Sequence, residues 1–221
     1  MDLIIKALED TSTFDRVLKD SYRHNNGFHK LVMDELPDGT KIRLHLYDGS
    51  HSHSPPPPKE HIHDHRWAFT STILAGQLHM DRFEWCEPGG DTGARDSYYD
   101  AYQYCADKST GRFGLMSLGK RRLRFVEECV FHQGESYSMA PEELHRIHGQ
   151  PLLGATTITL MATAPPVSST CHLFADPTQG HQIPTPHTQI ITPYHPHELV
   201  ALLRRMQQII ARAQNDRTSP N

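Results

Sequence analysis

Apolar residues recur at helical spacing only near the two ends of the chain. Residues 1–22 carry such a stripe among charged residues, and it is interrupted at Thr11–Thr13, where a capping residue would start a second helix. A second stripe over residues 198–214 consists of Leu199, Leu202, Leu203, Met206, Ile209 and Ile210. The pattern predicts a helical N-terminal lid, and a C-terminal helix that packs against the rest of the protein or against a second subunit.

Between these ends the period changes to that of β-strands. After the turn Pro37–Asp38–Gly39, an apolar face (Ile42, Leu44, Leu46) alternates with a polar face (Arg43, His45, Tyr47), which suits a ligand cavity. Further alternating or β-branched runs predict strands over residues 61–75, 77–85, 122–131, 134–141, 144–149, 156–163 and 169–174. Short strands with helices only at the ends indicate an all-β dominated fold, a closed antiparallel barrel or jelly roll.

Three segments show neither the helical nor the β-strand spacing of apolar residues. Residues 52–60 contain four successive prolines and predict an extended loop. The Gly-, Asp- and Tyr-rich stretch from Trp85 to about Gly114 is interpreted as a long irregular flap. Residues 177–196 are rich in Pro and His and are expected to wrap the surface. We therefore divide the chain into an N-terminal helical segment (1–28), a barrel (29–176), and a surface wrap with the C-terminal helix (177–221).

Composition and charge argue against some classes of binding partner for this domain. The formal net charge of −4 is spread along the chain, so nothing predicts a nucleic-acid face or a basic membrane patch. No apolar run suits a signal peptide or a membrane span, which leads us to expect a cytoplasmic protein. The four cysteines lack C-x-x-C spacing and are expected to be reduced. The unusual feature is 17 histidines beside 22 lysines and arginines, because imidazole is the commonest metal ligand.

Three of those histidines share one face of a predicted strand. Residues two apart in a strand point to the same side, so His61, His63 and His65 should face one way, together with Trp67 and Phe69. Two imidazoles can coordinate one metal ion, but a stable site needs a further protein ligand from another part of the chain.

His145 is the best candidate for that ligand, because it follows the proline turn at Pro141. His148, three positions later, is expected to point away. Two roles stay open for His61: a base next to the metal ligands, or a loop residue at the mouth of the cavity.

These two histidine segments resemble the two motifs of the cupin superfamily. The first motif matches at His63, His65 and Gly76, but Phe69 stands where the family has a glutamate. The second motif matches at Gly134, Pro141 and His145. The resemblance covers roughly residues 40–165 and implies a double-stranded β-helix, a jelly-roll barrel.

Because the glutamate is replaced, the sequence resembles the cupins that hold a metal with three histidines, as thiol dioxygenases do. The resemblance implies His63, His65 and His145 as ligands, with Fe(II) the natural first choice; imidazole also suits zinc, nickel and copper. Alternation along the strand places Arg43, His45 and Tyr47 on one face, which makes them candidates for catalytic or substrate-binding groups. The planar guanidinium of Arg43 would bind a substrate carboxylate through two hydrogen bonds. Trp67 would form an apolar wall of the site.

The leading hypothesis is a non-haem iron oxidoreductase of the dioxygenase type, acting with O2 on a small, polar, amino-acid-like carboxylate. One alternative keeps the site with a redox-inert ion such as zinc, in an isomerase, a lyase or an amine-joining biosynthetic enzyme. Another alternative is a non-catalytic cupin that binds a small molecule. Cupins often pair as dimers through strands or terminal helices, so the resemblance allows a homodimer, although the sequence does not reveal the oligomeric state.

Overall fold

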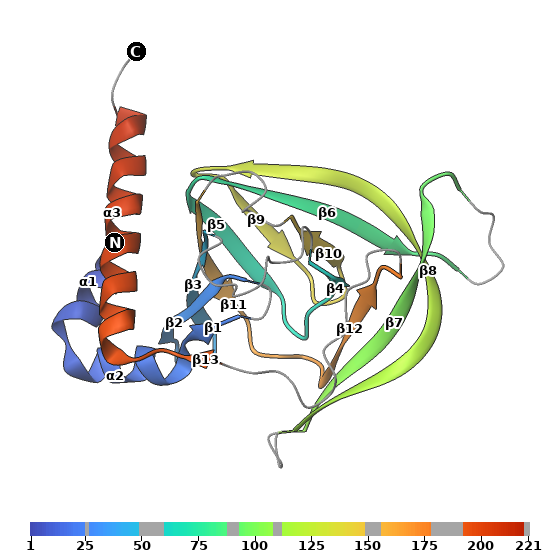
Figure 1. Cartoon of the computed structure of the whole chain (residues 1–221), viewed down its shortest axis with the longest axis horizontal. Helices are drawn as coiled ribbons and strands as arrows, with labels where there is room; N and C mark the ends of the chain where they lie inside the picture. The colour runs from blue at the N-terminus through green and yellow to red at the C-terminus, as the bar shows by residue number, and fades with distance from the viewer. Residues whose placement is uncertain are drawn as a thin grey trace.

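The computed structural model describes residues 1–24, 27–48, 60–87, 93–107, 112–148, 156–177 and 192–218, and contains two antiparallel sheets (Figure 1). Sheet A has seven strands in the order β13 (Thr192–Pro193), β1 (Tyr22–Arg23), β2 (His29–Glu35), β3 (Lys41–Tyr47), β11 (Thr157–Thr163), β5 (Phe69–Ala75) and β9 (Ser136–Met139).

Sheet B closes on itself in the order β10 (Leu144–Ile147), β4 (Ile62–His63), β12 (Thr170–Ala175), β7 (Asp96–Asp107), β8 (Arg112–His132) and β6 (Gln77–Trp85). Sheets A and B face each other across one apolar cluster. Phe69 and Ile73 enter it from β5, and Leu78 and Met80 enter it from β6. The space between the sheets, here called the lumen, holds the side chains discussed below. The predicted all-β dominated jelly-roll barrel with helices at both ends is confirmed.

Gly76 makes the tight connection between the two sheets. It joins β5 to β6 with a φ of +76°, and a Cβ atom there would collide with the Thr156 carbonyl oxygen. Only glycine adopts this conformation without strain, which explains the residue at this place in the histidine motif.

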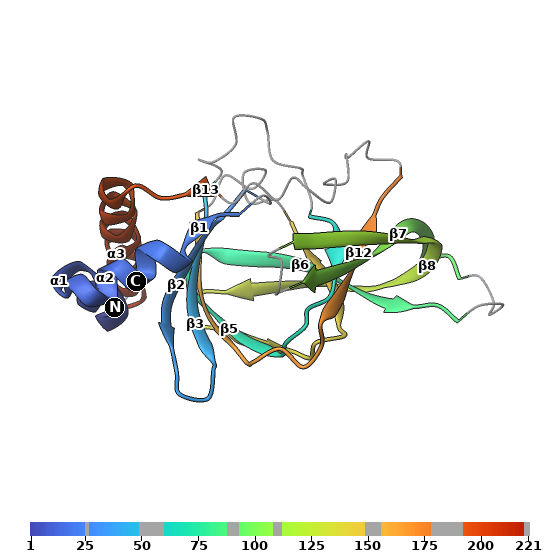
Figure 2. The same cartoon turned by 90° about the horizontal axis from the view of Figure 1, so that it is seen from below.

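The three helices cover the outer face of sheet A, away from the lumen (Figures 1 and 2). They are α1 (Asp2–Glu9), α2 (Thr11–Asp20) and α3 (Pro196–Thr218). The Asp10 side chain accepts a hydrogen bond from Thr13 N at 3.0 Å and caps α2, as the interruption in the helical stripe predicted. Leu199 and Leu203 of α3 pack with Leu44 and Leu46 of β3. The prediction of an N-terminal lid is therefore wrong: α1 and α2 lie behind the sheet and not over the site.

Two further predictions need correction. The expected flap after Trp85 is a long β-hairpin, because β7 pairs with β8 from Asp96 to Asp107 and also with β12. The hairpin closes sheet B around its own apolar cluster, which includes Ile62, Phe83, Leu123 and Phe174. The expected continuous strand through the histidines is also interrupted, since β4 ends at His63 and β5 begins at Phe69.

Several predicted features fall outside the described residues, among them nearly all of the proline loop, most of the 177–196 wrap, His181 and His187. The division of the chain at residues 28 and 176 stays a prediction, although β1 and β13 both extend sheet A. The four cysteines are free. Within the described ranges, no helix combines the length and apolar content that crossing a bilayer requires.

Candidate metal centre

The paired strands β4 and β10 bring the two histidine segments together. His63 and His145 are direct partners in the antiparallel register of these strands, so their side chains emerge side by side on one face. His65 follows two residues after His63, and its backbone N–H donates a hydrogen bond to the Pro141 carbonyl at 2.8 Å. The proline turn therefore also holds the segment after β4 in place.

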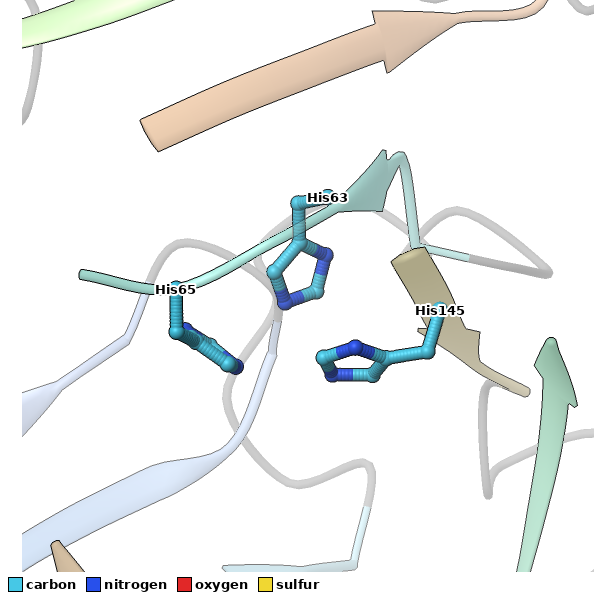
Figure 3. A group of neighbouring side chains, drawn as sticks. All are labelled: His63, His65 and His145. Carbon is cyan, nitrogen blue, oxygen red and sulfur yellow. The ribbon is translucent and has the colours of Figure 1, made fainter. Parts of the chain in front are cut away.

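The three rings converge on one point, as Figure 3 shows. Each of His63, His65 and His145 offers a ring nitrogen, and these nitrogens all lie within 4.8 Å of one another. The ring centroids are 4.6 Å apart for His63 and His145, and 5.0 Å apart for the other two pairs. This spacing lets a single ion reach all three nitrogens with only small ring movements.

Backbone carbonyls fix the orientation of two of these rings. His63 Nδ1 lies 2.8 Å from the His61 carbonyl oxygen, and His145 Nδ1 lies 3.2 Å from the Glu143 carbonyl oxygen. A carbonyl only accepts, so each Nδ1 carries the proton and each Nε2 keeps its lone pair for a ligand bond. His61 therefore acts on this group through its backbone oxygen.

Burial keeps His65 and His145 neutral. Desolvation lowers the pKa of His145 to about 3 and, with the neighbouring His63 and His145, holds the pKa of His65 well below its usual value. A metal ion requires deprotonated imidazole, and these two residues meet that requirement at neutral pH. The donor set and its orientation fit a divalent metal.

No carboxylate belongs to this group in the described part of the chain. Phe69, at the position of the family glutamate, is 4% exposed, and its ring lies edge-on to His65 with centroids 5.2 Å apart. Asp64 turns to the other side, where it accepts hydrogen bonds from the backbone N–H of His172 at 2.6 Å and from His172 Nδ1 at 2.7 Å.

Trp67 and Arg43 lie beside the imidazole cluster. The Trp67 ring stacks on His65 at 5.5 Å, and the Arg43 guanidinium lies over the Trp67 ring at 5.1 Å. Arg43 is 9% exposed, and its Nε makes no hydrogen bond within the described residues. An N–H that is buried without an acceptor is costly, so Arg43 Nε offers a hydrogen-bond donor to a bound ligand.

His45 and Tyr47 lie deeper along the same strand face and pack on Phe28, with both ring pairs 4.9 Å apart. Both ring nitrogens of His45 are buried and make no hydrogen bond in the parts of the chain that are described. These two side chains face the lumen as the alternation predicts. Tyr47 also packs against the apolar cluster that contains Phe69.

Two positively charged side chains near the site, Lys30 and Arg66, were not identified from the sequence. Lys30 pairs with His45 across β2 and β3, and burial, followed by the charges of Arg43, Lys41 and Arg66, lowers its pKa to about 7. The Arg66 guanidinium lies over the Trp67 ring at 5.3 Å, although strict alternation from His65 and Trp67 would place the Arg66 side chain on the opposite face. The break in the strand at residues 64–68 explains this error, since alternation holds only within a strand. Alternation along the strand places the Lys30 side chain on the same face as the inward-facing side chains of β3. This pattern could have identified Lys30 from the sequence.

His148 is not part of the imidazole cluster. Its Nε2 lies 2.7 Å from Asp81 on the opposite face of β6 and β10. Arg82, the partner of His145 in the register of β6 with β10, pairs with Glu127 at 3.2 Å and with Glu143 at 2.5 Å.

Comparison with known proteins finds no matching family model and no matching curated protein. Among solved structures, the chain is similar to a hydroquinone 1,2-dioxygenase bound to Cd2+ and 4-hydroxybenzonitrile, with 8% identity, a TM-score of 0.36, and coverage of 69% of this chain and 71% of that chain. It is also similar to an RmlC-like cupin from Shewanella frigidimarina, with 11% identity, a TM-score of 0.36, and coverage of 67% and 86%. A cupin-2 domain protein from the same bacterium gives 8% identity, a TM-score of 0.34, and coverage of 73% and 99%.

Proposed function

We propose that the chain is a metal-dependent cupin enzyme that uses Fe(II) and O2 to oxidise a small carboxylate-bearing molecule. The observation that carries the proposal is the convergence of three imidazoles beside cationic side chains in the lumen, with no carboxylate in that group among the described residues. His63, His65 and His145 would hold the ion. An iron ion bound there supplies open coordination positions and the redox chemistry that O2 requires.

The charge of the lumen supports an anionic substrate. Three neutral ligands leave the ion's positive charge uncompensated, and Arg43, Lys30 and Arg66 add to it. Arg43 would bind the substrate carboxylate with its two-pronged guanidinium, which the Trp67 ring holds in place. The substrate would then lie between Arg43 and the imidazole cluster.

Aromatic side chains would exclude water from the reacting groups. Trp67 and Phe69 both contact His65, and Phe69 is buried. An apolar wall beside the cluster strengthens every charge interaction with the substrate, because it lowers the local dielectric constant. In a dioxygenase both oxygen atoms enter the substrate, which supplies all the electrons, so no external reductant is needed.

Oxygen uptake by iron-loaded protein tests this proposal. Anaerobically prepared protein would be mixed with O2 and a panel of small amino and thiol carboxylates in an oxygen electrode. We expect substrate-dependent uptake in the wild type, background uptake in the His63→Ala variant, and wild-type uptake in a His132→Ala control, whose side chain is exposed on β8. Saturable binding without uptake would favour a binding protein, and turnover with zinc in the absence of O2 would favour a lyase or an isomerase; either result would overturn the proposal.

A further inference from the structure

A second group of metal-ligating side chains lies on the opposite face of sheet B. His79 on β6, Glu128 on β8 and His148 just after β10 each offer one ligand atom, and these atoms lie within 4.8 Å of one another. Leu78 and Met80, which flank His79, point into the lumen, so His79 points away from it. The group is therefore separate from the imidazole cluster described above.

The distances in this group suit one ion. Glu128 Oε1 lies 3.3 Å from His79 Nδ1 and 3.7 Å from His148 Nδ1. Tetrahedral bonds of about 2.0–2.1 Å place ligand atoms about 3.4 Å apart, so only small side-chain movements are needed. The two imidazole rings are nearly parallel, at 26°.

Glu128 contacts both imidazoles of this group. His148 Nε2 lies 2.7 Å from Asp81 Oδ1 and donates to that carboxylate, so Nδ1 is the ring nitrogen that faces Glu128. His79 Nδ1 lies 3.3 Å from the same Glu128 oxygen. A cation bound between these three atoms would replace the protons that otherwise link the rings to Glu128.

Asp81 supports His148 in the way that outer carboxylates support metal-bound histidines. Asp81 is 2% exposed and accepts a hydrogen bond from Arg146 Nε at 2.8 Å, so its carboxylate is held rigidly behind the ring. The backbone N–H of His148 also donates to the His79 carbonyl at 3.0 Å, which fixes the two ligand residues relative to each other. The site is thus held by β6, β8 and the end of β10 before any ion binds.

We propose that His79, Glu128 and His148 form a second metal site, of the zinc class, that clamps β6, β8 and β10 together. Two imidazoles and one carboxylate are a typical zinc donor set, with water completing the coordination. The imidazole side chains are 18% and 16% exposed and Glu128 is 50% exposed, so an ion reaches the site from solvent.

Zinc titration of metal-free protein tests this site without reference to activity. The His65→Ala variant removes the imidazole cluster, and we expect it still to bind about one Zn(II) per chain by calorimetry. Adding Glu128→Gln should abolish this saturable binding, whereas adding His132→Ala, on the same face of β8, should leave it unchanged. Glu128 is half exposed, and circular dichroism would confirm that its replacement leaves the fold intact.

Two results would overturn the second site: no zinc binding by the His65→Ala variant, or unchanged stoichiometry and affinity after Glu128→Gln is added. Neither result depends on oxygen uptake, so failure of the proposed enzyme activity and failure of this site are distinguishable.

Discussion

At the scale of single residues, Phe69 sets the charge of the candidate metal centre. A carboxylate in its place would neutralise part of the charge of a divalent ion, whereas the Phe69 ring adds only apolar contact with His65. The charges of the nearby cations Lys30 and Arg43 act on His65, one of the three imidazoles of this centre. The two following predictions concern these cations.

Replacing Arg43 with Met should raise KM for a carboxylate substrate by about 10- to 100-fold, because charge-assisted hydrogen bonds contribute about 1.5–3 kcal/mol. Methionine fills the buried space without the charge, and Arg43→Lys should recover only part of the loss, since lysine lacks the planar fork. Steady-state kinetics would measure both variants. Equal KM values for wild type and Arg43→Met would exclude Arg43 as the carboxylate anchor.

Lys30 should make substrate affinity depend on pH. Its pKa is lowered to about 7, mainly by burial, so the side chain is a cation below that pH and neutral above it. Affinity for an anionic substrate should therefore fall as pH rises through about 7, and a Lys30→Met variant should lose that dependence. Binding titrations between pH 6 and 8.5, roughly the range around the histidine and lysine transitions, would measure it. An unchanged pH profile in the variant would show that Lys30 does not contact the substrate.

At the scale of elements, the outer helices stabilise sheet A without touching the site. Leu203 of α3 is 0% exposed within the cluster that joins the helices to β3. Leu203→Ala should lower the free energy of unfolding by about 2–5 kcal/mol, because it leaves a cavity in a shared core. Urea denaturation would measure the loss, with exposed Gln208→Ala as the neutral control.

The same Leu203→Ala variant should bind metal at the imidazole cluster with wild-type affinity, since the helices lie on the other face of the sheet. Loss of metal in folded Leu203→Ala protein would show that the helices help to shape the site.

The sequence predicted most elements from periodicity alone, but it failed where pairing with distant strands decides the structure. Alternation in residues 41–47 placed Arg43 and His45 on the inward face. The β7 segment was misread because Gly and Asp near it signal a loop, while its tyrosines are stabilised by pairing with β8 and β12. Likewise, the break after His63 follows from backbone contacts such as that of His65 with Pro141, which no local pattern contains.

At the scale of the whole molecule, sheet B carries a group of potential metal ligands on each of its two faces. The register of β10 with β4 and β6 places His145 toward the lumen and His148 toward the second group. The first ligand set was predictable from motif spacing, because its residues lie in two short segments. The second was not, since His79, Glu128 and His148 come from three segments and meet only through the pairing of β6, β8 and β10.

The most direct test of the candidate metal centre is the iron content of anaerobically purified, Fe(II)-loaded protein, compared between the wild type and the His63→Ala, His65→Ala and His145→Ala variants. If the three imidazoles hold one ion jointly, as proposed, each variant should contain about one iron ion per chain fewer than the wild type. Equal iron content in the wild type and in any correctly folded variant would contradict a shared metal site at these three histidines.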